Sequence, residues 1–228
     1  MALPEIAARI SALLLIFLGG VVLIGYLFQR TLIYYPQAAD RAVLEPLATR
    51  EGLSPWRDAE GNFIGWYNRQ GAGIPVLILH GNAGHALHRI SIVSRLREVG
   101  IDPPIFILEY PGYGARPGTP SEKSLVAAAL KAIDLVGPEV ILLGESLGTG
   151  VACAAASQRP RSVRGLLLVT PFDSLIAVAK RHYPWAPVSF ILSDRYESSR
   201  ALQKCRAPLA AIVADEDAVT PVDSAIRL

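Results

Sequence analysis

A serine held between two glycines is the residue of this chain best placed to do chemistry. The segment Gly144-Glu145-Ser146-Leu147-Gly148 has the form G-x-S-x-G, and it joins an apolar run to a stretch of small residues. A turn this tight between a strand and a helix strains the backbone at the serine, and the flanking glycines remove Cβ atoms that would collide. The pattern predicts that Ser146 Oγ stands above a sheet as a nucleophile. An ordinary glycine-rich turn is the weaker alternative, because both flanking elements fit.

The sequence HGNAG, which begins at His80, is the second candidate motif. Attack on a carbonyl group places negative charge on its oxygen, and fixed backbone N–H donors stabilise that charge. We predict that the N–H groups of Asn82 and Leu147 form this oxyanion hole, and that His80 shapes the loop instead of transferring protons. His85 and His88 lie three residues apart but have no evident third ligand. The sequence therefore predicts neither a metal site nor a cofactor.

An acidic turn follows the last apolar run and supplies the candidate triad acid. A serine nucleophile needs a base, the base needs an orienting carboxylate, and the chain order serine, acid, histidine is a known arrangement. We assign the acid to Asp217 and keep Asp215 as the alternative, whereas Asp223 fits a helix cap better.

The general base is the missing member of this set. Eleven residues follow Asp217, and none of them is histidine. His182 lies in an insertion that does not resemble a strand-end loop, so we do not assign it. We expect the chain to be C-terminally incomplete, and a protein without the base to be nearly inactive.

Strand-like and helix-like segments alternate through most of the chain. Short apolar runs predict strands at 76–79, 105–108, 140–143, 166–169 and 209–213, and longer segments predict helices at 86–99, 121–136, 148–157 and 174–180. This order predicts an α/β fold with a mostly parallel sheet, helices on both faces, and an antiparallel edge strand around 61–67. Ligands bind at the carboxyl ends of such strands, where the three motifs lie.

The N-terminus carries an uncharged apolar stretch from Ile10 to Phe28. Its length is sufficient for a helix to cross a hydrocarbon core of about 30 Å. Gln29 and Arg30 follow, where a cleaved signal peptide would carry small residues. We therefore predict one uncleaved transmembrane helix within residues 1–30, although the flanking charges do not fix its orientation.

The composition argues against nucleic acid as a partner, and the two cysteines show no pattern of a metal or catalytic site. Of the 228 residues, 51% are hydrophobic and 18% charged, and the net charge of +2 comes without basic runs, so nucleic acid is not expected as a partner. Cys153 and Cys205 lack metal-ligand spacing. Packed thiols are the expected state, with a disulfide as the alternative in an oxidising compartment.

These motifs, taken in order, resemble the alpha/beta-hydrolase superfamily. Within it the chain is similar to the single-pass, membrane-anchored alpha/beta-hydrolase-domain proteins related to lipases and thioesterases. The resemblance rests on LFQRTLIYYP, on HGNAG with His88-Arg89, and on EYPGYGARPGTPSE, GESLG, TPFDSL and ADEDAVTP.

The resemblance implies a hydrolase domain over residues 31–228 on the non-cytoplasmic side of a membrane, with Ser146 as nucleophile and Asp217 as acid. It places the base past Leu228. Two residues depart from the family pattern: Ala214 stands where glycine is usual, and Glu145 stands where a basic residue is frequent, which argues against anionic substrates.

The function predicted from the sequence is a serine hydrolase that cleaves an ester or thioester through an acyl-enzyme on Ser146. The anchor favours a lipid-like substrate, although a fold and a tether do not define a pocket. The rival hypothesis is a catalytically inactive membrane protein that acts as a binding or scaffold module. A peptidase is a further possibility, while haloalkane-type hydrolases prefer aspartate at the elbow. Apolar residues near Trp185 and Phe190 suggest a lid or, equally, ordinary packing.

Overall fold

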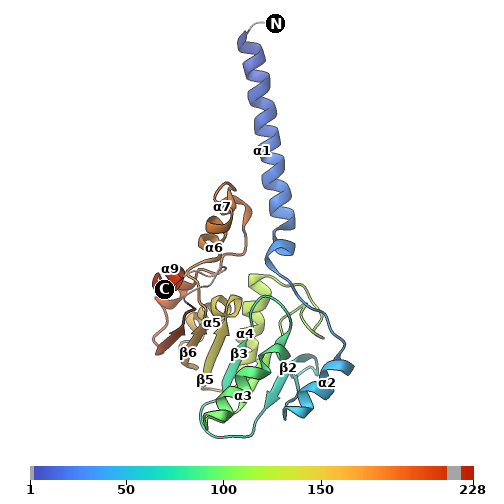
Figure 1. The fold of residues 1–228 in the computed structure, drawn as a ribbon, viewed down its shortest axis with the longest axis vertical. Coiled ribbons are helices and arrows are strands. Elements are labelled where there is room, and N and C mark those ends of the chain that lie inside the picture. Colours follow the sequence, from blue (N-terminus) through green and yellow to red (C-terminus); the bar gives the residue numbers. More distant parts are fainter. Residues whose placement is uncertain (1–2, 215–221) are drawn as a thin grey trace.

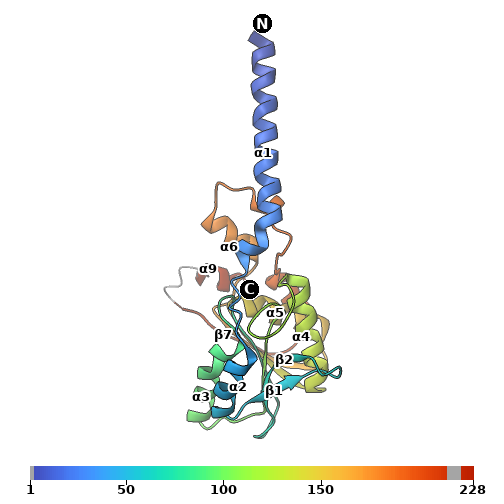
Figure 2. The same ribbon diagram turned by 90° about the vertical axis from the view of Figure 1, so that its right-hand side faces the viewer.

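A computed structural model describes residues 3–214 and 222–228 of the chain. One long helix, α1 (Leu3–Ile33), projects from an α/β domain (Figures 1 and 2). The part of α1 from Arg9 to Ile33 is long and apolar enough to cross a membrane, and none of its most apolar window is buried. The predicted helical segment at the N-terminus is therefore present.

The domain is built on one sheet of seven strands in the order β1-β2-β4-β3-β5-β6-β7. β1 and β2 form an antiparallel edge, β2 also pairs antiparallel with β4, and the remaining pairs are parallel. The strand bounds are β1 (Ser54–Arg57), β2 (Phe63–Asn68), β3 (Val76–Leu79), β4 (Ile105–Leu108), β5 (Val140–Glu145), β6 (Val163–Val169) and β7 (Leu209–Ile212). This arrangement confirms the predicted fold class.

Helices cover both faces of the sheet, because the central strands are apolar on both sides. Leu77 and Leu79 of β3 face a core beneath α4 and α5, whereas Val76 and Ile78 face a second core beneath α2 and α3. The helices are α2 (Arg41–Arg50), the 3₁₀ turn η1 (Ala86–Arg89), α3 (Ile90–Glu98), α4 (Glu122–Val136), α5 (Leu147–Gln158), α6 (Leu175–His182), α7 (Val188–Ile191), α8 (Ser198–Leu202) and α9 (Val222–Ile226).

Local sequence signals explain several of the helix starts. At α4 the Ser121 hydroxyl accepts from the Ser124 N–H at 3.0 Å, and the Ser124 hydroxyl accepts from the Ser121 N–H at 2.9 Å. This reciprocal capping satisfies two donors that a helix start leaves without partners. At α2 a single bond caps the helix, because the Asp40 carboxylate accepts from the N–H of Ala42 at 2.8 Å.

Helix α2 is the main element that the sequence pattern did not predict. Pro46 lies inside it, and a proline removes a backbone donor and normally interrupts a helical pattern. Leu44 and Ala48 are buried against the sheet, so tertiary packing stabilises a helix that local propensity disfavours.

The segment that follows α1 runs across the carboxyl edge of the sheet. Pro36 forms a parallel bridge with Gly84 of the HGNAG loop, and Ala38 forms another with Gly114. The end of the apolar helix therefore lies beside the HGNAG loop and the loop that contains Gly114.

Candidate active site

Ser146 lies at the turn between β5 and α5, as the G-x-S-x-G pattern predicts. Its backbone has φ 49° and ψ −117°, which is left-handed and strained for a residue with a Cβ atom. Its N–H donates to the Val169 carbonyl at 2.9 Å, and its carbonyl accepts from the Thr149 N–H at 2.9 Å, so hydrogen bonds hold both sides of the turn. The side chain is half-buried, and the Oγ has no hydrogen-bond partner among the described residues.

The glycines around Ser146 are required by close backbone contacts. A Cβ atom at Gly148 would overlap the carbonyl oxygens of Leu79 and His80, and one at Gly144 would lie 2.6 Å from the Gly148 oxygen. Backbone atoms cannot give way as flexible side chains can. The β5–α5 turn and the end of β3 therefore lie in contact, and this contact brings the HGNAG loop beside Ser146.

Both N–H groups predicted for the oxyanion hole are available. Within the described parts of the chain, neither the Asn82 nor the Leu147 backbone N–H donates to any acceptor. Leu147 is the first residue of α5, where helical N–H groups have no partner within the helix. Two unpaired donors thus follow directly on β3 and β5, the strands that hold the two motifs.

The Asn82 side chain has a role that the sequence analysis missed. Its Oδ1 accepts from the Tyr35 N–H at 3.2 Å and from the Tyr113 hydroxyl at 3.1 Å, and its Nδ2 donates to the Ile33 carbonyl. Ile33 is the last residue of α1. One side chain therefore fastens the HGNAG loop to the end of the apolar helix.

Glu145, the residue before Ser146, is paired with a cation. Arg89, at the end of η1, forms an ion pair with the Glu145 carboxylate, and the two side chains are 13% and 29% exposed. The guanidinium also lies against Gly81, where an added Cβ would be 3.0 Å from Nη2. The Glu145 charge beside Ser146 is thus compensated locally, which weakens the argument against anionic substrates.

His80 is fully buried, consistent with the predicted role in shaping the loop. Its Nδ1 lies 2.8 Å from the Gly81 oxygen, its Nε2 lies 3.5 Å from Glu109 Oε1, and its ring packs on Tyr110 with centroids 4.1 Å apart. The Glu109 carboxylate in turn accepts from the Ala86 N–H at 3.0 Å. These contacts fix both ends of the HGNAG segment.

The remaining histidines and cysteines supply no metal site in the described residues. His85 and His88 stack with ring centroids 3.9 Å apart, and burial lowers the pKa of His85. His182 ends α6 and is exposed. Cys153 and Cys205 are free thiols, in agreement with the expectation of packed cysteines.

Asp217 and its alternative Asp215 lie outside the described residues, so their role stays a prediction. Among the described residues, Asp173 follows β6 and joins the final helix to the domain. Its carboxylate accepts from the Ser224 hydroxyl and from Arg227 Nε, both at 2.7 Å. These hydrogen bonds outweigh the effect of burial and hold the pKa of Asp173 below its ordinary value.

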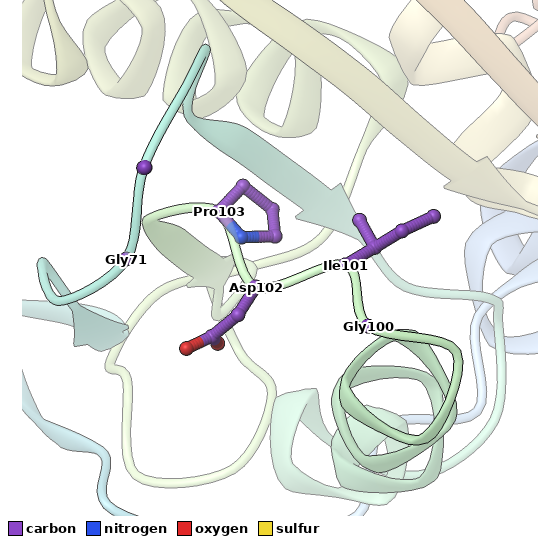
Figure 3. A pocket seen from close by; sticks show the side chains of 6 residues that line it. Gly71, Gly100, Ile101, Asp102 and Pro103 are labelled. Carbon is purple, nitrogen blue, oxygen red and sulfur yellow. The ribbon is translucent and has the colours of Figure 1, made fainter.

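An open hollow of about 620 Å³ lies at the opposite edge of the sheet (Figure 3). Its lining comes from the segments that precede β3 and β4, and comprises Gly71, Ala72, Gly100, Ile101, Asp102 and Pro103. Asp102 pairs with Arg97 at 3.3 Å. Since the hollow lies at the amino ends of the strands, it is not part of the candidate site around Ser146.

The sheet order, the strained serine and the two donor loops define an α/β hydrolase architecture. The family model for the alpha/beta hydrolase fold matches residues 74–225, and the chain belongs to this family.

Relatives match the chain beyond the range of the family model. Uncharacterized protein Rv2307c of Mycobacterium tuberculosis is 33% identical over 97% of this chain and 82% of its own length. Lysophosphatidylserine lipase ABHD12 of Mus musculus is 29% identical over 73% of this chain, and the matched region is 48% of that protein. An alpha-beta hydrolase from Vibrio vulnificus has a similar fold, with a TM-score of 0.60, 24% identity, and coverage of 77% of this chain and 69% of its own.

Proposed function

We propose that this protein is a serine hydrolase that cleaves an ester or thioester bond through an acyl-enzyme. Ser146 is the nucleophile, the N–H groups of Asn82 and Leu147 bind the oxyanion, and Asp217 is the triad acid. In this scheme Ser146 Oγ attacks the acyl carbon, the leaving group departs, and water later releases the acyl group. The proposal needs no metal or cofactor and assigns no general base.

The observation that carries the proposal is the strained turn at Ser146. A φ of 49° at a non-glycine residue costs on the order of 1–3 kcal/mol, which persists only where the surrounding structure imposes it. This strain occurs directly before the first residue of α5, in a turn that contacts the backbone of Leu79 and His80 at Gly148, and it supports the proposal that Ser146 is the nucleophile. An ordinary surface turn would not require this conformation.

The proposal includes the membrane. Residues 1–30 act as a single-pass anchor, with a span at about 10–28, and residues 31–228 form the hydrolase domain on the non-cytoplasmic side. The support is the apolar helix from Arg9 to Ile33 and the contact between its last residue and Asn82. A site at the end of a membrane helix favours lipid-like esters, and a relative that acts as a lysophosphatidylserine lipase agrees with this substrate class.

A fluorophosphonate probe tests the nucleophile directly, because it reacts with activated serines. The full-length natural protein, with its anchor, would be used in detergent micelles or vesicles. We expect labelling of the unaltered full-length protein, loss of labelling in Ser146→Ala, and full labelling in the control Ser157→Ala, at the far end of α5, where Ser157 Oγ donates to the Ala154 carbonyl. Folded full-length protein that takes up no label would refute the hydrolase and favour a binding module.

A further inference from the structure

The segment between α6 and α7 exposes large apolar side chains beside the membrane helix. Trp185 is 78% exposed, Phe190 is 80% exposed and Tyr183 is 54% exposed. Exposed aromatic residues in such a cluster are costly in water and are typical of surfaces that contact a membrane or a partner. In Figure 1 this segment, drawn in orange, stands beside the lower turns of α1 and away from the sheet.

The contact between α7 and α1 shows at which level along α1 this segment lies. Helix α7 packs on α1 at Gly25, where an added Cβ would lie 3.1 Å from Ile191 Cδ1. Gly25 lies within the uncharged stretch that ends at Phe28, so at 1.5 Å per residue the contact is about 4.5 Å inside the apolar boundary. Phe190, next to Ile191, is therefore at the level of the hydrocarbon region.

A polar layer lies just below and marks the expected surface of the bilayer. Gln29 is buried, and its Oε1 accepts from the Ser193 N–H at 2.6 Å and from the Ser193 hydroxyl at 3.0 Å. The next residues of these two segments, Arg30 and Asp194, form an ion pair at 3.7 Å. The same polar layer thus ends both the apolar helix and the α7 segment.

A buried tyrosine pair adds to this docking. Tyr34 donates to Asp194 at 2.7 Å, and the Tyr196 hydroxyl lies 3.0 Å from that of Tyr34. Burial raises the pKa of both phenols, so both stay neutral. These hydrogen bonds join the residues that follow α7 to the residue that follows α1.

We propose that residues 183–191 form a second membrane contact, which inserts into the same leaflet as the C-terminal end of α1. The occupant of this apolar surface is the lipid bilayer, because the surface continues that of the proposed span at the same height. The inference deepens the proposed function, on whose membrane anchorage it rests. It implies that lipid esters reach Ser146 from the bilayer, since the site lies on the edge of the sheet that faces α1.

Tryptophan fluorescence tests this contact without requiring activity. The chain contains three tryptophans, and Trp56 and Trp66 are buried in the domain at 4% and 0% exposure, so Trp185 alone reports on the surface. The full chain would be placed in phosphatidylcholine vesicles with plain or dibrominated acyl chains. Trp185→Phe, which keeps the two buried tryptophans, is the matched control.

We expect brominated lipid to remove most of the emission that Trp185 contributes, and to leave the emission of Trp185→Phe unchanged. Aqueous iodide should have little effect on either protein. Strong quenching of Trp185 by iodide and none by bromine would place the segment in water and overturn the inference. Protection from both quenchers would mean that protein covers the segment, and would overturn it equally.

The fluorescence experiment and the labelling experiment test the membrane contact and the hydrolase activity separately. If Ser146 takes up no fluorophosphonate but brominated lipid quenches Trp185, the membrane contact stands and the hydrolase proposal fails. If both hold, Phe190→Ser should slow hydrolysis of a long-chain ester in vesicles, while hydrolysis of a short water-soluble ester should be unchanged.

Discussion

Removing the Asn82 side chain tests whether the end of α1 positions the oxyanion loop. Asn82→Ala deletes the hydrogen bonds to the Ile33 carbonyl, the Tyr35 N–H and the Tyr113 hydroxyl. A typical hydrogen bond contributes about 1 kcal/mol net, so the three together contribute roughly 3 kcal/mol. Tyr113 is buried, so its hydroxyl would lose its acceptor without gaining full access to water.

The expected kinetic effect is a fall in kcat of about 10- to 100-fold, which corresponds to about 1.4–2.7 kcal/mol of lost transition-state stabilisation. The KM should change little, because the Asn82 N–H is proposed to bind the oxyanion and not the ground-state carbonyl. Hydrolysis of a p-nitrophenyl ester and the rate of fluorophosphonate labelling would both be measured on the full-length natural protein in micelles. Thermal unfolding would be followed in parallel.

Two further variants separate the individual contacts. Asn82→Asp keeps both acceptor contacts but sets a carboxylate oxygen against the Ile33 carbonyl, so we expect it to lose at least as much activity as Asn82→Ala. Tyr113→Phe removes a single hydrogen bond, and we expect it to lose less. If Asn82→Ala is less stable than the unaltered protein yet keeps its kcat, the loop does not depend on this side chain, and the reasoning is refuted.

Three other predictions concern the packing of the turn, its charge and a buried thiol. Gly148→Ala should destabilise the domain by about 2–3 kcal/mol, because the added Cβ would meet the backbone at the end of β3. The control Gly165→Ala, whose Cβ would lie 3.7 Å from its nearest neighbour, should change stability by less than about 1 kcal/mol. Equal losses of stability in thermal or urea unfolding would contradict this prediction. Arg89→Met should lower the free energy of unfolding by about 1–3 kcal/mol, because it leaves the half-buried Glu145 carboxylate without its cation. Adding Glu145→Gln should restore part of this loss. If the two substitutions have additive effects in a double-mutant cycle, the ion pair does not contribute to stability. Burial raises the pKa of Cys153 to about 12, so almost none of this thiol is ionised at pH 8. Mass spectrometry should therefore find maleimide on Cys205 first, and Cys153 should react faster as the pH rises. Rapid labelling of Cys153 at pH 8 would refute its burial.

The apolar runs and the glycine spacing along the chain were sufficient to predict the α/β architecture and the strained turn at Ser146. The strands at 76–79 and 105–108 have the predicted bounds, and the helix after Ser146 begins where the small residues begin. These features were readable because burial on both faces of a parallel strand leaves a continuous apolar run, and because a sharp turn requires glycine at fixed positions. The apolar helix was readable for the same reason, since hydrocarbon demands about 20 apolar residues in one stretch.

Tertiary structure alone decided how these parts are joined. Helix α2 forms despite Pro46 because Leu44 and Ala48 are buried, and no local pattern indicates that burial. The contact between Asn82 and Ile33 joins residues 49 positions apart, and the Arg89 pair that compensates Glu145 links the end of η1 to the end of β5. Such contacts depend on how the strands are ordered in the sheet and on where α1 meets it, and periodicity along the chain carries no information about either.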